Sequence, residues 1–173
     1  MIKLIASDLD GTLIGHDFRF RPRTLRALEA ARAAGIDIVF VTGRPSRWLT
    51  PLREQTDFDS YAICSNGAVV YHLGANEVEE VNGADPAVIA RTHELLEPMF
   101  PDATYTLETV DTVYIQGPHE GGEVLEGARV VEAKIAEALE RIGSCARHGP
   151  GYSAGTRASG GGFAGVGDPR RGR

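Results

Sequence analysis

The stretch Asp8-Leu9-Asp10-Gly11-Thr12-Leu13 follows a short apolar run, residues 3–6, of the kind found in buried β-strands. Its two carboxylates therefore lie one residue apart at the C-terminal end of a strand, where open α/β sheets bind ligands. At that spacing one group can attack while the other moves a proton. We expect Asp8 to attack phosphorus and form an aspartyl-phosphate, and Asp10 to protonate the leaving oxygen and then activate water. Gly11 would let the backbone approach a phosphate closely, and the Thr12 hydroxyl would support the loop.

Three other structures compete for this stretch. A calcium-binding loop requires glycine and glutamate at positions where this chain has Leu13 and Arg19, which excludes it. A hairpin turn at Asp10-Gly11 is locally compatible with the flanking apolar residues. A receiver domain, in which a strand-end aspartate accepts phosphate for signalling, is compatible with the stretch taken alone.

The next two elements favour phosphate chemistry. Residues 22–34 read as a helix with proline at its start, and residues 36–41 as an apolar strand that ends at Thr42-Gly43-Arg44-Pro45. Such a βαβ unit implies parallel strands joined by a right-handed crossover. The Thr42 hydroxyl and the Gly43 amide would then reach the crevice that holds Asp8, and a helix opening near Pro45 would direct its positive end there. A hairpin at residues 3–14 predicts nothing about Thr42.

The winding is expected to change after a third strand. A second helix begins at Pro45, with Pro51 as a point where it kinks or divides. Residues 61–64 form the third strand, which ends at Ser65-Asn66-Gly67, and residues 68–71 and 77–81 pair as a hairpin. The sheet therefore passes from parallel to antiparallel pairing.

An α/β module is predicted after this hairpin. Asp85-Pro86 caps and opens a helix that ends near Pro98 or Pro101. Residues 103–109 and 112–116 alternate like antiparallel strands, and residues 130–142 are predicted to be helical. The glycine-containing segment 120–126 reads as a flexible loop.

The last 31 residues differ in composition from the rest of the chain. Residues 143–173 contain ten Gly, five Arg and one Asp, but no Leu, Ile, Lys or Glu. We expect this segment to be disordered, because it buries too little apolar surface to offset its ordering entropy, and to be an out-of-frame or aberrant terminus. A natural Gly/Arg-rich tail with weak nucleic-acid affinity is the alternative, although dispersed arginines make a poor basic patch.

Composition limits the class of protein. The chain has 173 residues, 42% apolar and 24% charged, as in an ordinary globular protein, and residues 1–142 carry 13 basic and 23 acidic groups, a net of −10. Cys64 and Cys145 are too few for a disulfide framework and are wrongly spaced for zinc. The first residues lead into Asp8 and do not read as a secretory signal, and no apolar run reaches about 20 residues. We expect a cytoplasmic protein without a membrane segment; its oligomeric state stays open.

Together the motifs resemble those of the haloacid dehalogenase superfamily, and within it the Cof-type phosphatases with a C2-type α/β cap. Residues 8–13 match the family's first motif, residues 41–45 match its second, and residues 65–68 resemble the turn that precedes the cap. The resemblance covers about residues 1–142. It implies an α/β fold with a Rossmann-like parallel-sheet core, incomplete here, over residues 1–82, a partial cap over 83–142, and the atypical tail over 143–173.

The resemblance also implies roles for individual residues. Asp8 would be the nucleophile and Asp10 the acid/base, and both would hold Mg²⁺, Asp10 through its backbone carbonyl. Phosphate binding would fall to Leu9, Thr42, Gly43 and Arg44, and Asn66 would line the edge of the site. The implied reaction is Mg²⁺-dependent hydrolysis of small phosphorylated metabolites such as sugar phosphates, with no nucleic-acid partner.

The chain departs from the family pattern after the cap. The family requires a lysine there, followed by Gly-Asp and then Asn-Asp, whose acidic groups complete the magnesium shell. Lys134 falls in a helical pattern typical of a solvated face, and Asp168 is followed by no second acid. We therefore expect impaired activity, with a catalytically inactive fragment that binds phosphate or a partner as the alternative. A phospho-accepting signalling domain is less compatible with the cap-like insertion.

Overall fold

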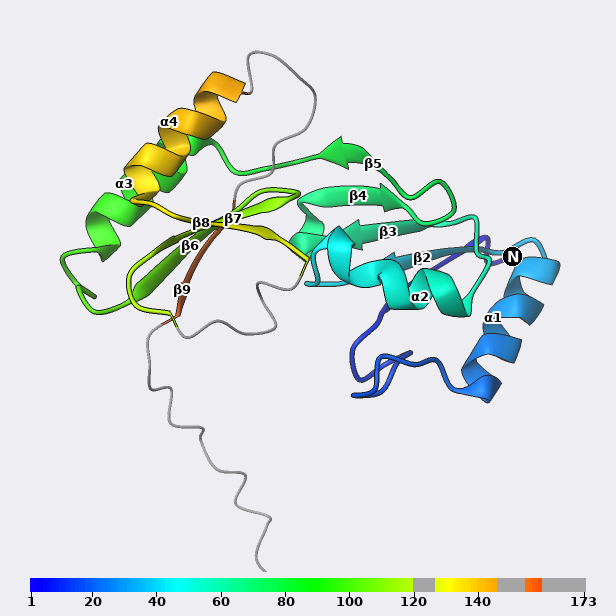
Figure 1. The fold of residues 1–173 in the computed structure, drawn as a ribbon. Coiled ribbons are helices and arrows are strands. Elements are labelled where there is room, and N and C mark those ends of the chain that lie inside the picture. Colours follow the sequence, from blue (N-terminus) through cyan, green and yellow to red (C-terminus); the bar gives the residue numbers. More distant parts are fainter. Residues whose placement is uncertain (120–126, 146–154, 160–173) are drawn as a thin grey trace, which may run out of the picture.

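Five strands form the first sheet, in the order β1-β2-β3-β4-β5 (Figure 1). The computed structural model describes residues 1–119, 127–145 and 155–159, with only the backbone described for 143–145 and 155–159. β1, β2 and β3 run parallel, and β4 and β5 are antiparallel to their neighbours, as predicted. The bounds are β1 (Leu4–Asp8), β2 (Asp37–Val41), β3 (Tyr61–Cys64), β4 (Val69–His72) and β5 (Glu77–Val81).

Helices cover one face of this sheet. α1 (Pro22–Ala33) connects β1 to β2, with Pro22 at its first position, where a missing N–H costs nothing. The helix predicted from Pro45 is divided into a 3₁₀ turn, η1 (Ser46–Leu49), and α2 (Thr50–Gln55). Pro51 lies in the first turn of α2 and explains the division, because a proline is tolerated there but not in a helix interior.

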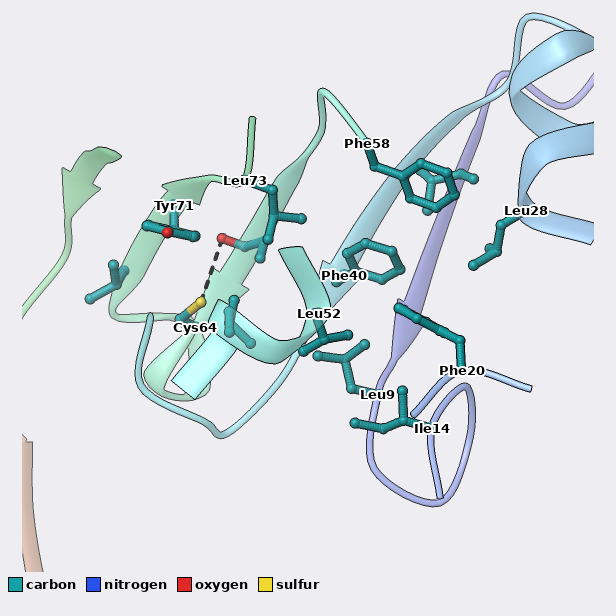
Figure 2. Close-up of a cluster of buried hydrophobic side chains, with 14 residues drawn as sticks. Leu9, Ile14, Phe20, Leu28, Phe40, Leu52, Phe58, Cys64, Tyr71 and Leu73 are labelled. Carbon is teal, nitrogen blue, oxygen red and sulfur yellow. Dashed lines mark hydrogen bonds between the residues drawn. The ribbon is translucent and has the colours of Figure 1, made fainter. Parts of the chain in front are cut away.

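A cluster of aromatic and aliphatic side chains fills the space between these helices and the sheet. Phe40 on β2 is 1% exposed and lies at its centre (Figure 2). Its ring centroid is 5.9 Å from that of Phe20 and 6.3 Å from that of Phe58. Leu28 of α1 and Leu52 of α2 are buried in the same cluster. This packing fixes the strands whose ends carry the predicted motifs.

The opposite face of the sheet exposes apolar side chains. Val41 and Tyr61 alternate with buried residues along β2 and β3, and they are 36% and 43% exposed. Leu4 alternates with less exposed residues along β1 and is 54% exposed. β1 also stands at the edge of the sheet, next to β2 alone among the described strands. Parallel strands are normally covered on both faces, so this face presents surface that water solvates poorly.

We expect a chain that carries Leu4→Lys and Tyr61→Lys to self-associate less than the unsubstituted chain. Both substitutions place charge on the exposed face, and Leu4→Lys also places charge on the edge strand β1, where it opposes pairing with another chain. Sedimentation velocity over a range of concentrations measures the effect. The matched control is Val88→Lys with Leu95→Lys on helix α3 (Pro86–Leu96), at positions that are 60% and 63% exposed. Equal reductions in both variants would show that net charge, rather than this face, governs association.

The second module pairs four strands with two helices. Its sheet has the order β8-β7-β6-β9, in which β7 and β8 are parallel and the other pairs antiparallel. The α3 helix begins after Asp85, whose carboxylate accepts a hydrogen bond of 2.7 Å from the Ala87 amide. α3 and α4 pack on the sheet around the fully buried Leu107 and Ile135. The bounds are α3 (Pro86–Leu96), β6 (Thr104–Glu108), β7 (Thr112–Gln116), β8 (Arg129–Glu132), α4 (Ile135–Cys145) and β9 (Gly155–Ser159).

Two sequence predictions differ from the structure in this module. The helix predicted over residues 130–142 was wrong at its start: Arg129–Glu132 is a strand, and the helix begins at Ile135. The β-branched pair Val130-Val131 extends the sheet beside β7, which explains the difference. Within the predicted tail, α4 continues to Cys145 and Gly155–Ser159 forms β9 against β6. The other tail residues, and the predicted loop at 120–126, lie outside the described residues.

The predicted boundary between core and cap falls between the end of β5 at Val81 and the start of α3 at Pro86. None of the helices in the described part of the chain has the length and apolar character needed to span a bilayer.

Candidate active site

The predicted motifs meet at the carboxyl ends of three adjacent parallel strands. In the sheet register Asp8 lies opposite Val41, and Val41 lies opposite Ile63. The residues that follow these strands, Thr42 and Ser65, therefore begin their loops at the same edge of the sheet as Asp8. This is the crevice where open α/β sheets bind ligands.

The loop after β1 is anchored by Leu9. Its side chain is fully buried, and its carbonyl oxygen accepts hydrogen bonds from the amides of Thr12, Leu13 and Ile14 at 3.2, 3.0 and 3.0 Å. The flanking residues Asp8 and Asp10 are exposed. The Thr12 hydroxyl donates to Asp8 Oδ2 at 3.1 Å, so that one oxygen of the Asp8 carboxylate is fixed by the loop.

Gly11 provides the turn that this loop requires. Its φ is +73°, a conformation that residues with a side chain rarely adopt. The loop is not the tip of a hairpin, because β1 pairs in parallel with β2. The hairpin alternative from the sequence is therefore excluded.

Arg44 holds Asp10 from the next strand end. Its Nε lies 3.1 Å from Asp10 Oδ1 and 2.8 Å from Oδ2, and its Nη2 lies 2.5 Å from Oδ1. The guanidinium also stacks over the Phe18 ring, 4.0 Å from its centroid. Only 15% of the Arg44 side chain is exposed, against 46% of that of Asp10. Arg44 was predicted from the sequence to bind phosphate. No sequence pattern indicated that it would also contact Asp10 and Phe18.

This contact sets the protonation of Asp10. The hydrogen bond from Arg44 holds the pKa of Asp10 below its ordinary value; partial burial opposes the shift, and the charge of Arg44 and a hydrogen bond from Thr42 add to it. The folded pKa lies below the unfolded value of about 3.9. The pair therefore stabilises the fold above that pH, and the contribution is lost as pH falls through the folded pKa. At neutral pH Asp10 is a carboxylate.

Arg44→Gln is expected to raise the pKa of Asp10, because the dominant hydrogen bond and the nearby positive charge are both removed. The measurement is a carbon-detected NMR titration of the Asp10 carboxyl group between pH 2 and 6. Arg21→Gln serves as the control, since Arg21 forms an exposed pair with Asp17 at 3.1 Å in the same region. An unchanged Asp10 titration in the Arg44 variant would contradict the assignment.

Thr42 and Gly43 form the second wall of the site. Thr42 is 3% exposed, and its Oγ1 accepts a hydrogen bond of 3.1 Å from the Arg44 amide. Gly43 faces Asn66: a Cβ atom at Gly43 would lie 2.9 Å from Asn66 Oδ1. Asn66 has a left-handed backbone with φ 56°, which asparagine tolerates, and its amide donates to the Thr42 carbonyl at 3.3 Å. The structure thus brings Asn66 to the edge predicted for it.

The donor chemistry at this edge fits a hard cation only in part. The Asp8 carboxylate and the Asp10 carbonyl are oxygen donors of the type Mg²⁺ prefers, and Mg²⁺ commonly keeps several waters beside one or two protein carboxylates. Among the described residues no group of three or more His, Cys, Asp or Glu side chains is arranged to hold a metal. Lys134 is exposed and lies between β8 and α4 in the second module.

A family model described as haloacid dehalogenase-like hydrolase matches residues 5–141, which include every site residue discussed above. The chain belongs to this family. The resemblance inferred from the first and second motifs is therefore confirmed, as is the α/β fold class.

Curated relatives of this family member are named as phosphatases. Pyridoxal phosphate phosphatase YbhA of Escherichia coli is 33% identical over 123 residues, which are 71% of this chain and 44% of YbhA. The putative phosphatase YxeH of Bacillus subtilis is 43% identical over 82 residues, 45% of this chain and 30% of YxeH. The chain thus spans less than half the length of these two relatives.

A solved structure supports the fold. BT1666 from Bacteroides thetaiotaomicron, a phosphatase of the same superfamily, superposes with a TM-score of 0.62 at 23% identity. The superposition covers 92% of this chain and 68% of BT1666. At this identity the likeness shows a shared fold for the core and the second module.

Proposed function

We propose that the chain carries the phosphoryl-transfer half-site of a Mg²⁺-dependent phosphomonoester hydrolase that acts on small phosphorylated metabolites, such as sugar phosphates. The observation that carries the proposal is the convergence of Asp8, Asp10 and Thr42 at adjacent strand ends, with Asp8 exposed and its carboxylate held by Thr12. The phosphatase names of the curated relatives support the same class of reaction.

The reaction proceeds in two displacements at phosphorus. Asp8 Oδ attacks, a P–O bond forms to the carboxylate, and the ester P–O bond breaks. The leaving oxygen takes a proton from Asp10, and Asp10 then removes a proton from the water that hydrolyses the acyl phosphate. The Thr42 hydroxyl and the backbone at Leu9 and Gly43 bind the phosphate oxygens. When bound, Mg²⁺ would be held by Asp8 and the Asp10 carbonyl and would neutralise charge on the phosphate.

Arg44 links phosphate binding to the acid/base group. It holds Asp10 as a carboxylate in the free site, whereas the first displacement needs a proton on this group. A phosphate dianion at Thr42 and Gly43 competes for the same guanidinium, since Arg binds phosphate as readily as carboxylate. Partial release of Asp10 would then raise its pKa at the moment when it must donate.

A second candidate function is phosphate binding without turnover. It is favoured by the small number of acidic donors in the described part of the site and by the position of Lys134 in the second module. In that case phosphate would be held at Thr42, Gly43 and Arg44, and charge repulsion between the Asp8 carboxylate and the phosphate dianion would prevent attack on phosphorus.

Hydrolysis of an aryl phosphate by the 173-residue chain, with Mg²⁺ and with a chelator, decides between the two. Turnover that requires Mg²⁺ supports the hydrolase. Binding of inorganic phosphate by calorimetry without turnover, in a sample shown to be folded by circular dichroism, supports the second candidate. Turnover that is equal with and without the chelator would contradict the proposed metal dependence.

A further inference from the structure

An ion pair joins the two modules close to the site. Arg47 lies on η1, which begins directly after the Thr-Gly-Arg-Pro motif, and Glu108 ends β6 of the second module. Arg47 Nη1 is 2.6 Å from Glu108 Oε1, and both atoms are shielded from solvent. The Arg47 side chain is 10% exposed and that of Glu108 is 32% exposed. Breaking a buried pair by removing one partner is costly, because the remaining charge is left unpaired.

The turn that carries Glu108 is held rigidly. The Thr109 hydroxyl donates to Asp111 Oδ1 at 3.1 Å, and the Thr112 hydroxyl donates to the same oxygen at 3.1 Å. The Thr112 amide donates to Thr109 Oγ1 at 3.0 Å. This hydrogen-bond network fixes the conformation of residues 109–112. Glu108, at the end of β6 next to this turn, therefore has a defined position relative to Arg47.

Two further contacts surround the ion pair. Val110, in the same turn, packs against the hydrophobic cluster of the core. The backbone of Gly127 runs past the aliphatic part of Arg47: a Cβ atom at Gly127 would lie 3.7 Å from Arg47 Cδ. Arg47 is thus approached from two segments of the second module.

Arg47 also neighbours the phosphate-binding motif. The Trp48 ring lies 5.9 Å from the Arg47 guanidinium carbon and 5.6 Å from that of Arg44. Arg44 in turn holds Asp10. Three successive contacts, from Arg47 to Trp48, from Trp48 to Arg44 and from Arg44 to Asp10, therefore connect the ion pair to the acid/base group.

We propose that Arg47 and Glu108 are positioning residues, whose ion pair sets where the second module stands over the phosphate site. The inference rests on the proposed function, and it adds that the β6–β7 turn of the second module lies beside the phosphate site. Neither residue touches the reacting atoms; the pair fixes the distance between the Thr42 loop and the β6–β7 turn. Loss of the pair should therefore weaken substrate binding and increase access of solvent to the site, while the Asp8 loop stays as it is.

Acrylamide quenching of Trp48 tests the contact without reference to catalysis, because Trp48 is the single tryptophan of the chain. We expect Glu108→Gln to raise the quenching constant, and the charge exchange Arg47→Glu with Glu108→Arg to return it toward the original value. Glu132→Gln is the matched control, since Glu132 belongs to the same module but is 80% exposed and lies 3.9 Å from His119. Equal quenching constants for the unsubstituted chain, the Glu108 variant and the control would overturn the proposal.

Kinetics separate this inference from the proposed function. With an active chain, Glu108→Gln should lower kcat/KM for the aryl phosphate by roughly 30-fold, chiefly through KM. A loss confined to kcat would overturn the positioning role. If no substrate is hydrolysed by the unsubstituted chain, the proposed function fails, whereas the quenching series still decides whether the pair holds the modules together.

Discussion

Asp8→Asn is expected to lower Mg²⁺-dependent aryl-phosphate hydrolysis by at least about 10³-fold, the scale seen when a catalytic nucleophile is removed. The amide is neutral and does not attack phosphorus, so the first displacement stops. Its Oδ1 still accepts the hydrogen bond that Thr12 donates to Asp8 Oδ2 at 3.1 Å, and the loop should keep its shape. Steady-state rates measure the loss, and the thermal midpoint confirms that the variant folds.

The control for this variant is Asp17→Asn, in the same N-terminal segment. Asp17 pairs with Arg21 on the surface, with 45% of its side chain exposed, and such pairs contribute about 0–1 kcal/mol. Its rates should match those of the unsubstituted chain. Mg²⁺-dependent turnover in the Asp8 variant above about one tenth of the rate of the unsubstituted chain would show that another group attacks phosphorus. It would contradict the assignment of Asp8 as the nucleophile.

The lifetime of the phosphorylated enzyme distinguishes hydrolysis from signalling. If Asp8 is phosphorylated and Asp10 activates water, acid quenching during turnover should trap a phosphoenzyme that decays within the catalytic cycle. A phospho-accepting domain would instead keep the modification after the donor is removed. The position of Asp10, two residues from Asp8 and on the same exposed loop, favours the short lifetime.

The first sheet could be predicted from the sequence because its signals are local and agree with one another. Apolar runs of strand length end at Ala6, Val41 and Cys64, and each is followed directly by polar or glycine residues. A helix with proline at its start separates the first two strands, which fixes the crossover and the parallel pairing. The parallel pairing of these two strands alone requires Asp8 and Thr42 to lie at the same, carboxyl end of the sheet.

The remaining features depend on contacts between distant residues. Val130-Val131 was assigned to a helix because the residues after them are helical, yet a place beside β7 was open in the sheet and β-branched residues suit it. Arg44 was expected to bind phosphate; in the structure its guanidinium also donates hydrogen bonds to Asp10 and stacks over the Phe18 ring. Phe18 has a positive φ of 55°, which no sequence pattern indicates. The ion pair between Arg47 and Glu108 could not be predicted from the sequence either, because 60 residues separate its two partners along the chain.

Phe40→Ala is expected to cost about 3–5 kcal/mol of unfolding free energy, a large part of the roughly 5–15 kcal/mol by which a domain is ordinarily stable. Phe40 is 1% exposed between Phe20 and Phe58, so its removal leaves a cavity that rigid strands cannot close (Figure 2). Urea denaturation followed by Trp48 fluorescence measures the loss. Phe100→Ala, at a position that is 52% exposed, should cost less than about 1 kcal/mol. Equal losses would mean that the face between α1, α2 and the sheet does not hold the strand ends, and with them Asp8 and Thr42, in place.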